Sequence, residues 1–300
     1  MVRDACFTRF TSDPGVFALP PSKIPGFSVD DPRLVEEWKT RLSEQVEYLR
    51  EVRSESLPHE TVARAKALVL LFSKNGGGTD SCANYRDLLH NIERLPEGEG
   101  QGCCSDHTEV FLALSSIYGL DARETRQRGH THAELYDPGR EKWIWIDPYL
   151  ALMARLEDGE YLSYLEMRER YLADRSVEFV FFGTPDHWVY GGDARDQMLY
   201  DEKEDLWEAS LTLGNDVFAQ DAFARRVRFL PREAGQFVAF LIGRRPPFLL
   251  LVDDYDDEAR ALRIRRRRLV VGGAILLAAH LGWPLALAFG QRSGDGPPRG

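Results

Sequence analysis

Two strand-like segments joined by a short turn constrain most strongly how this chain of 300 residues folds. Side chains alternate in polarity along residues 130–136, and residues 142–147 alternate tryptophan with isoleucine. The sequence Asp-Pro-Gly-Arg at 137–140 is typical of a turn. A third strand-like segment, residues 122–126, comes shortly before them. We therefore expect an antiparallel sheet in this part of the chain.

The position of the turn sets the expected register of the hairpin. A turn centred on the Pro-Gly pair places His130 directly opposite Asp147 and leaves His132 opposite Trp145. Directly opposed side chains have Cβ atoms about 4.5–5.5 Å apart, whereas diagonal neighbours lie roughly 7–8 Å apart. The spacing therefore favours His130 over His132 as the partner of Asp147.

A helix is expected to begin at Cys104, before the sheet. Apolar residues recur at helical spacing from there to Ile117, and Gly119 is a suitable C-terminal stop. The N-terminus of a helix carries partial positive charge and free N–H groups, which favour a thiolate. A nearby imidazolium favours it further, and a carboxylate on the far side of that ring fixes its tautomer and orientation.

Three motifs, in this order, resemble those of the transglutaminase-like superfamily, which shares the papain-type catalytic core. They are Gly-x-Cys-x-Asp at 102–106, a histidine followed four residues later by Glu-hydrophobic-Tyr at 130–136, and Trp-x-x-x-Asp-Pro at 143–148. The match covers about residues 60–150. This resemblance implies that Cys104 is the nucleophile, His130 the general base and acid, and Asp147 the group that orients His130.

The expected fold class is α+β, with N-terminal helices and a central nucleophile helix packed on an antiparallel sheet. We expect six regions: an irregular segment at 1–30, a transglutaminase-like core at 31–175, a smaller β-containing module at 176–262, a basic collar at 263–268, a transmembrane helix at 269–290 and a tail at 291–300. Further helices are expected at 31–54, 58–75, 85–95 and 161–172, and further strands at 177–182, 226–230, 236–242 and 248–252.

The four cysteines are too few for a disulfide scaffold, and the adjacent Cys103 and Cys104 are unsuited to bond with each other. We therefore expect four reduced thiols in a reducing compartment. Cys103 is a rival nucleophile, although both the Gly-x-Cys and the Cys-x-Asp spacing align on Cys104. A zinc site that adds His130 and His132 to these cysteines lacks the usual C-x₂₋₄-C spacing and a fourth ligand, so no metal or other cofactor is predicted.

Three more side chains are candidates for substrate binding. Trp143 and Trp145 share a face with Asp147, where they either wall a cleft or fill the core. His132 lies on the face of His130 and is either a binding or a structural residue. The backbone N–H of Cys104 is the expected oxyanion donor, with Gln101 or a residue of the 76–84 loop as a second donor.

A run of 22 residues without a charged side chain begins at Leu269 and ends at Gly290. As a helix it is ~33 Å long, which is enough to cross a bilayer core. Arginines concentrate before this run, at Arg263 and at positions 265–268, which predicts a cytoplasmic catalytic domain. An anionic lipid is a candidate partner of that arginine cluster, from Arg263 to Arg268.

The functional prediction is a membrane-anchored cysteine enzyme that acts on an amide or ester bond of a protein or peptide substrate. Resolution of the acyl-enzyme by water makes it a protease or amidase, and resolution by an amine makes it an acyl transferase. The alternative is a catalytically inactive transglutaminase-like domain that binds a protein at the membrane. The net charge of −10 argues against a general nucleic-acid binder.

Overall fold

The computed structural model describes residues 8–11, 13–24, 36, 60–72, 103–127, 130–174, 176–183, 209–212 and 248–251, with runs of one to three residues between 215 and 238 and between 264 and 275. The chain forms two compact units: residues 1–8 together with 254–300, and residues 9–253. The second unit contains the sheet and the candidate site, and the fold described below is that of this unit.

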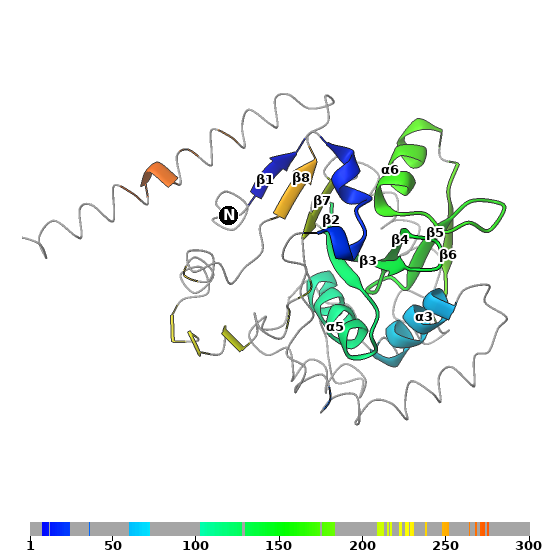
Figure 1. Cartoon of the computed structure of the whole chain (residues 1–300), viewed down its shortest axis with the longest axis horizontal. Helices are drawn as coiled ribbons and strands as arrows, with labels where there is room; N and C mark the ends of the chain where they lie inside the picture. The colour runs from blue at the N-terminus through cyan, green and yellow to red at the C-terminus, as the bar shows by residue number, and fades with distance from the viewer. Residues whose placement is uncertain are drawn as a thin grey trace, which may run out of the picture. The chain divides into compact units, whose positions relative to one another are not determined.

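One sheet of eight strands organises the structure, in the order β1-β8-β7-β2-β3-β4-β5-β6 (Figure 1). Neighbouring strands from β8 to β6 pair antiparallel. The strands are β1 (Thr8–Thr11), β2 (Ala122–Arg126), β3 (Thr131–Asp137), β4 (Lys142–Asp147), β5 (Leu152–Arg155), β6 (Glu178–Phe181), β7 (Ala209–Thr212) and β8 (Phe248–Leu251). The helices are α3 (Glu60–Phe72), α5 (Cys104–Ile117) and α6 (Tyr164–Ala173), with short 3₁₀ helices η1 (Pro14–Phe17) and η2 (Pro21–Lys23). The predicted α+β class is therefore confirmed.

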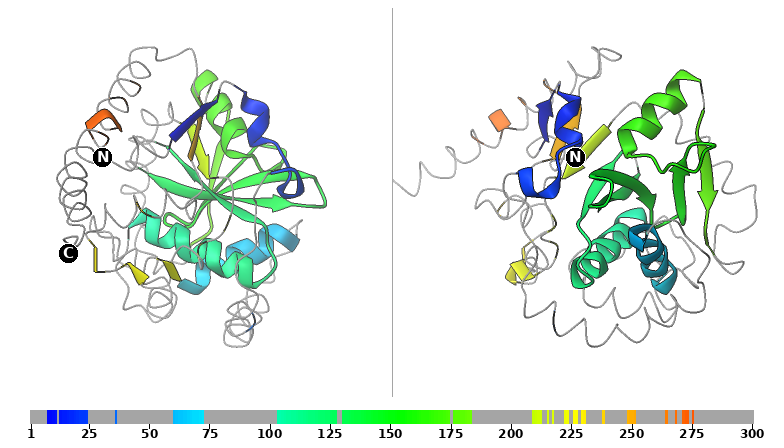
Figure 2. Two further views of the ribbon diagram at one scale, coloured as in Figure 1. Left: turned by 60° about the vertical axis from the view of Figure 1, so that its left-hand side comes forward. Right: turned by 45° about the vertical axis from the view of Figure 1, so that its right-hand side comes forward.

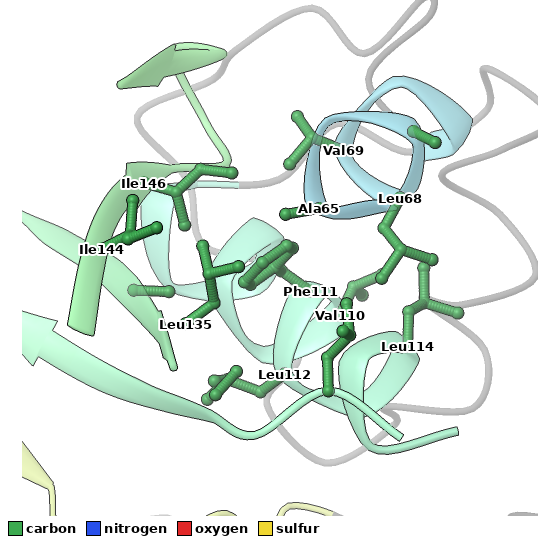
Figure 3. Close-up of a cluster of buried hydrophobic side chains, with 14 of the residues drawn as sticks. Ala65, Leu68, Val69, Val110, Phe111, Leu112, Leu114, Leu135, Ile144 and Ile146 are labelled. Atoms are coloured by element: carbon green, nitrogen blue, oxygen red, sulfur yellow. The ribbon is translucent and has the colours of Figure 1, made fainter. Parts of the chain in front are cut away.

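Apolar residues cover both faces of the sheet because strand side chains alternate between the faces. Leu135 of β3 and Ile144 of β4 contribute to a buried cluster with α3 and α5 (Figure 3). Trp145 and Leu152 face the opposite way, into a second cluster with α6 and with Phe17 of η1. The sheet thus lies between α3 and α5 on one face and α6 with the 3₁₀ helices on the other (Figure 2).

Helix α5 begins at Cys104, as predicted. Cys103 is its N-cap residue, and the backbone N–H of Cys103 donates to Oδ2 of the buried Asp106 at 3.0 Å. This hydrogen bond satisfies the Cys103 N–H, which would otherwise have no partner within the helix. Gly119 follows the helix with φ of +69°, a left-handed conformation that glycine adopts without steric cost.

The predicted hairpin register is wrong by two residues. The observed ladder pairs Asp137 with Lys142 and Ala133 with Ile146, so His132 and not His130 is in register with Asp147. The turn closes with a hydrogen bond from the Arg140 N–H to the Asp137 carbonyl at 3.2 Å. One further residue, Glu141 with φ of +53°, then precedes β4 and moves the centre of the turn along the chain.

The prediction of a separate β-containing module at 176–262 is corrected by the pairing of its strands. β6 pairs with β5, β7 pairs with β2, and β8 pairs with β7, so all three extend the same sheet as the core. The sequence also missed β1, β5 and β7, which are four residues each. Strands this short carry little periodicity.

Several other predicted elements differ from the structure or lie outside it. The described positions at 226–227 and 229–230 form turn or helical structure and not the expected strand. The helix at 85–95 lies outside the described residues, as does all but Glu36 of the helix at 31–54. The described part of the chain contains no helix that is both long enough and apolar enough to span a bilayer. Of the predicted span at 269–290, positions 271–273 and 275 are described, and they are helical.

A buried ion pair joins the sheet to the N-terminal segment and to α6, which lie on the face opposite α3 and α5. Arg123 of β2 and Glu134 of β3 are directly opposed, and both are at most 1% exposed. The Arg123 guanidinium donates to Glu134 Oε2 at 2.9 and 2.6 Å, and also donates to the Phe17 carbonyl. Glu134 Oε1 accepts the backbone N–H of Tyr164, the first residue of α6, at 2.7 Å. The pair therefore connects two strands, the N-terminal segment and α6.

Loss of one partner of this pair is expected to destabilise the fold strongly. Arg123→Met leaves the Glu134 carboxylate buried without its counter-charge, and such changes typically cost about 3–5 kcal/mol. Urea unfolding of the purified chain measures the loss. Arg155→Met is the matched control, because Arg155 and Glu178 are also directly opposed on neighbouring strands but are 35% and 47% exposed. Exposed pairs contribute about 0–1 kcal/mol. Equal losses in the two variants would contradict the role assigned to the buried pair.

Candidate active site

The candidate site forms where β3 begins and β4 ends. Because these strands run antiparallel, the start of one lies beside the end of the other. His130 directly precedes β3 and Asp147 is the last residue of β4. His130 Nε2 lies 2.6 Å from Asp147 Oδ2, so the predicted pair forms despite the different register. His130 reaches Asp147 diagonally, and it can do so because both side chains are on the same face of the sheet.

Both carboxylate oxygens of Asp147 accept hydrogen bonds that fix the position of this side chain. Oδ2 accepts from His130, and Oδ1 accepts the backbone N–H groups of Tyr149 and Leu150 at 2.9 and 3.0 Å. Burial alone would raise the pKa of this carboxyl, but the charge of His130 and its hydrogen bond bring the pKa below its ordinary value. Asp147 is therefore an ionised carboxylate that orients the imidazole.

The Cys104 thiol lies on the other side of His130. Burial tends to raise the pKa of this thiol, but the hydrogen bond and charge of His130 and a hydrogen bond from the Thr131 backbone N–H outweigh it, so that the pKa is below its ordinary value. Since Nε2 of His130 bonds Asp147, Nδ1 is the ring nitrogen left for the thiol. The described residues thus bring together all three groups that the sequence singled out.

Cys103 differs from its neighbour in its redox state. Cys104 is a free thiol, whereas Cys103 is disulfide-bonded, and its partner lies outside the described residues. The expectation of four reduced thiols is therefore wrong. A sulfur in a disulfide is not a thiolate, so Cys103 is excluded as a rival nucleophile while this bond is intact.

The three side chains predicted to contact a substrate belong to the interior. Trp143 and Trp145 are 2% and 1% exposed, and His132 is fully buried. The Trp143 indole N–H donates to the Leu19 carbonyl at 2.8 Å, and its ring lies under the Arg123 guanidinium. Their burial leaves no surface for a substrate. The two tryptophans therefore fill the core, which was the alternative role considered for them.

His132 lies on the same face as His130 but makes different contacts. Its Nδ1 is 2.6 Å from Oγ1 of Thr125, the residue opposite it on β2, and its ring centroid is 4.5 Å from that of Tyr164. Burial holds the pKa of His132 well below its ordinary value. A neutral ring in this position is a structural neighbour of His130 and does not compete with it for protons.

Other predicted features of the site are partly outside the described residues. Gln101 and the 76–84 loop, the candidates for the second oxyanion donor, are among these. Cys104 itself is the first residue of α5, where its backbone N–H has no intrahelical partner. Among the described residues, no three histidine, cysteine, aspartate or glutamate side chains are grouped so as to hold a metal ion.

Two contacts of the site had little or no signal in the sequence. The hydrogen bond from Thr131 to the thiol uses a backbone group, which residue identity does not reveal. Tyr149 has its ring centroid 6.1 Å from that of His130 and 5.1 Å from that of His107. Its position directly after the Asp-Pro motif was the available clue.

Comparison of the chain with protein-family models, with curated proteins and with solved structures finds no match. The resemblance to transglutaminase-like proteins therefore rests on the sequence motifs.

The two neighbouring cysteines are expected to differ in their reaction with an alkylating agent. Without a reductant, iodoacetamide should modify Cys104 and leave Cys103 unmodified, because a disulfide sulfur does not attack the reagent. After reduction and denaturation, both should be modified. Peptide mass spectrometry of the purified chain distinguishes the two residues. Modification of Cys103 in the unreduced, folded chain would contradict the disulfide.

Removal of the imidazole should raise the pKa of the Cys104 thiol. In His130→Ala the burial that opposes ionisation persists, while the largest influences that favour the thiolate are lost. The alkylation rate as a function of pH should therefore have its midpoint above that of the wild type, and above about 8.5, the value of a free cysteine. His132→Phe is the control, since it keeps an aromatic ring in the buried position and should leave the midpoint unchanged. An unchanged midpoint in His130→Ala would show that His130 does not stabilise the thiolate.

Proposed function

We propose that this protein is a cysteine enzyme that attacks the carbonyl carbon of an amide or ester bond and passes through a thioester. The observation that supports this best is the arrangement around His130. Its Nε2 is bonded at 2.6 Å to a fully buried carboxylate, and its imidazole is hydrogen-bonded to a thiol of lowered pKa at a helix N-terminus. A buried carboxylate, an imidazole and a thiol in this order form the orienting group, the base and the nucleophile of a catalytic triad.

The proposed reaction follows from these three groups. The Cys104 thiolate adds to the carbonyl carbon, and the protonated His130 transfers its proton to the leaving nitrogen or oxygen as the bond to carbon breaks. The product of this step is a thioester on Cys104. His130 then takes a proton from water or an amine, which adds to the thioester and releases the acyl group. Cys104 leaves as the thiolate and His130 keeps the proton it has taken, which restores the starting pair of thiolate and imidazolium.

The oxyanion that forms during each addition needs hydrogen-bond donors. The backbone N–H of Cys104 is the proposed donor, because it belongs to the first turn of α5, where N–H groups have no partner within the helix. The partial positive charge at this end of the helix adds to its effect.

A transglutaminase-like core is the finer fold assignment that we propose. The chain order of nucleophile helix, histidine strand and aspartate strand, together with the packing of α5 against β2 and β3, supports it. A protein or peptide is the proposed substrate, with resolution by water or by an amine.

Membrane attachment through residues 269–290 is also part of the proposal, with anionic lipid at Arg263 to Arg268. The distribution of arginines favours a cytoplasmic catalytic domain. The Cys103 disulfide favours an oxidising compartment instead. Labelling of Cys104 in sealed cells with a thiol reagent that does not cross membranes distinguishes the two orientations, since it succeeds only if the domain is outside.

Trapping of the acyl-enzyme tests the proposed chemistry directly. Incubation with an activated acyl ester should add one acyl group to Cys104, and hydroxylamine should remove it, as seen by intact and peptide mass spectrometry. Cys104→Ala should form no such adduct, and His130→Ala and Asp147→Asn should form and release it at least about 10²-fold more slowly. Ester turnover by Cys104→Ala at the wild-type rate would overturn the proposal, and so would the absence of any adduct on Cys104 of the wild type, which would favour the binding module.

A further inference from the structure

The end of β4 leaves one stretch of the β3 backbone without a strand partner. In the β2–β3 ladder, the His130 carbonyl accepts the Gln127 N–H and the Tyr136 N–H donates to the Asp121 carbonyl. Backbone groups of even-numbered β3 residues therefore point to β2, and those of odd-numbered residues point to β4. The β3–β4 pairing ends with Ala133, and its continuation would place Pro148 opposite Thr131.

Pro148 cannot pair with Thr131 as a strand residue would. A proline has no N–H to donate, and β4 ends one residue before it. Thr131 is nevertheless a buried residue, with an exposed fraction of 6%. Buried backbone groups require partners, which must then come from another element.

Helix α5 supplies both partners. The Thr131 N–H donates to the Cys104 sulfur, and the Thr131 carbonyl accepts the hydroxyl of Thr108 at 3.1 Å. Cys104 and Thr108 are four residues apart in α5, so they lie one turn apart on the same face of the helix. Thr108 is fully buried, and this hydrogen bond fixes the first turn of α5 against the residue that follows His130.

We propose that Thr108 is a positioning residue for the nucleophile, which acts through the Thr131 backbone to hold the Cys104 sulfur in line with the Thr131 N–H and beside His130. This role rests on the proposed function of Cys104. Without the Thr108 hydroxyl, the Thr131 carbonyl loses its partner and the backbone on both sides of the Thr131 Cα can shift, which weakens the hydrogen bond from the Thr131 N–H to the sulfur. The Asp-Pro motif thereby has a second role, because Pro148 ends the ladder where the nucleophile needs the freed N–H.

The test compares Thr108→Val with Thr108→Ser in the full chain. Thr108→Val keeps the shape of the side chain and removes the hydroxyl, and Thr108→Ser keeps the hydroxyl. We expect Thr108→Val to shift the midpoint of Cys104 alkylation to higher pH and to lower the rate at pH 6 about three- to tenfold. Thr108→Ser should restore the wild-type profile. Alkylation does not require turnover, so this outcome is independent of the acyl-enzyme experiment.

Ser115→Ala is the matched control. It also removes a fully buried hydroxyl from α5, and that hydroxyl has no hydrogen-bond partner among the described residues. Its alkylation profile should be that of the wild type. The proposal is overturned if Thr108→Val retains the wild-type profile, if Thr108→Ser is as impaired as Thr108→Val, or if Ser115→Ala shifts the midpoint equally. Failure of both Thr108→Val and Thr108→Ala to fold would also overturn it, by assigning Thr108 to stability.

Discussion

The buried ion pair between Arg123 and Glu134 is the interaction on which the rest of the structure depends. A charged pair this far from water needs further hydrogen bonds besides those between its two members. The partners are the Phe17 carbonyl for the guanidinium and the Tyr164 N–H for the carboxylate, so the N-terminal segment and α6 must both be in place. This network thereby joins β2 and β3 to the N-terminal segment and to the start of α6. His132 of β3 packs against Tyr164 of this network, two residues after His130 in the chain.

The geometry of the candidate site follows from where two antiparallel strands stop. β4 ends at Asp147, and the next residues turn so that their N–H groups bind the free oxygen of that carboxylate. The same ending exposes the Thr131 backbone to α5, whose first turn carries Cys104, the proposed nucleophile. One local feature, the Asp-Pro sequence, thus orients the imidazole through a side chain and makes a backbone donor available to the thiol. Both consequences favour the charged pair of thiolate and imidazolium over the neutral one.

The hairpin shows how a correct pairing can follow from a wrong register. The pairing of His130 with Asp147 was predicted from direct opposition, yet the two residues meet diagonally. The additional turn residue, Glu141 in a left-handed conformation, has no strong signal in the sequence because glutamate rarely adopts it. The predicted pairing of His130 with Asp147 is nevertheless correct, because a register shift of two residues keeps every side chain on the same face of the sheet. A shift of one residue would have moved each side chain to the opposite face.

The sequence by itself determined the local elements and the order of the chemical groups. Helical periodicity and a capping pattern are properties of neighbouring residues, so the start of α5 at Cys104 and the bounds of β2 and β4 could be predicted. Tertiary structure alone decided the burial of Trp143 and Trp145, the addition of β6, β7 and β8 to the core sheet, and the different states of Cys103 and Cys104. These depend on contacts between residues far apart in the chain, whose energies no short window of sequence contains.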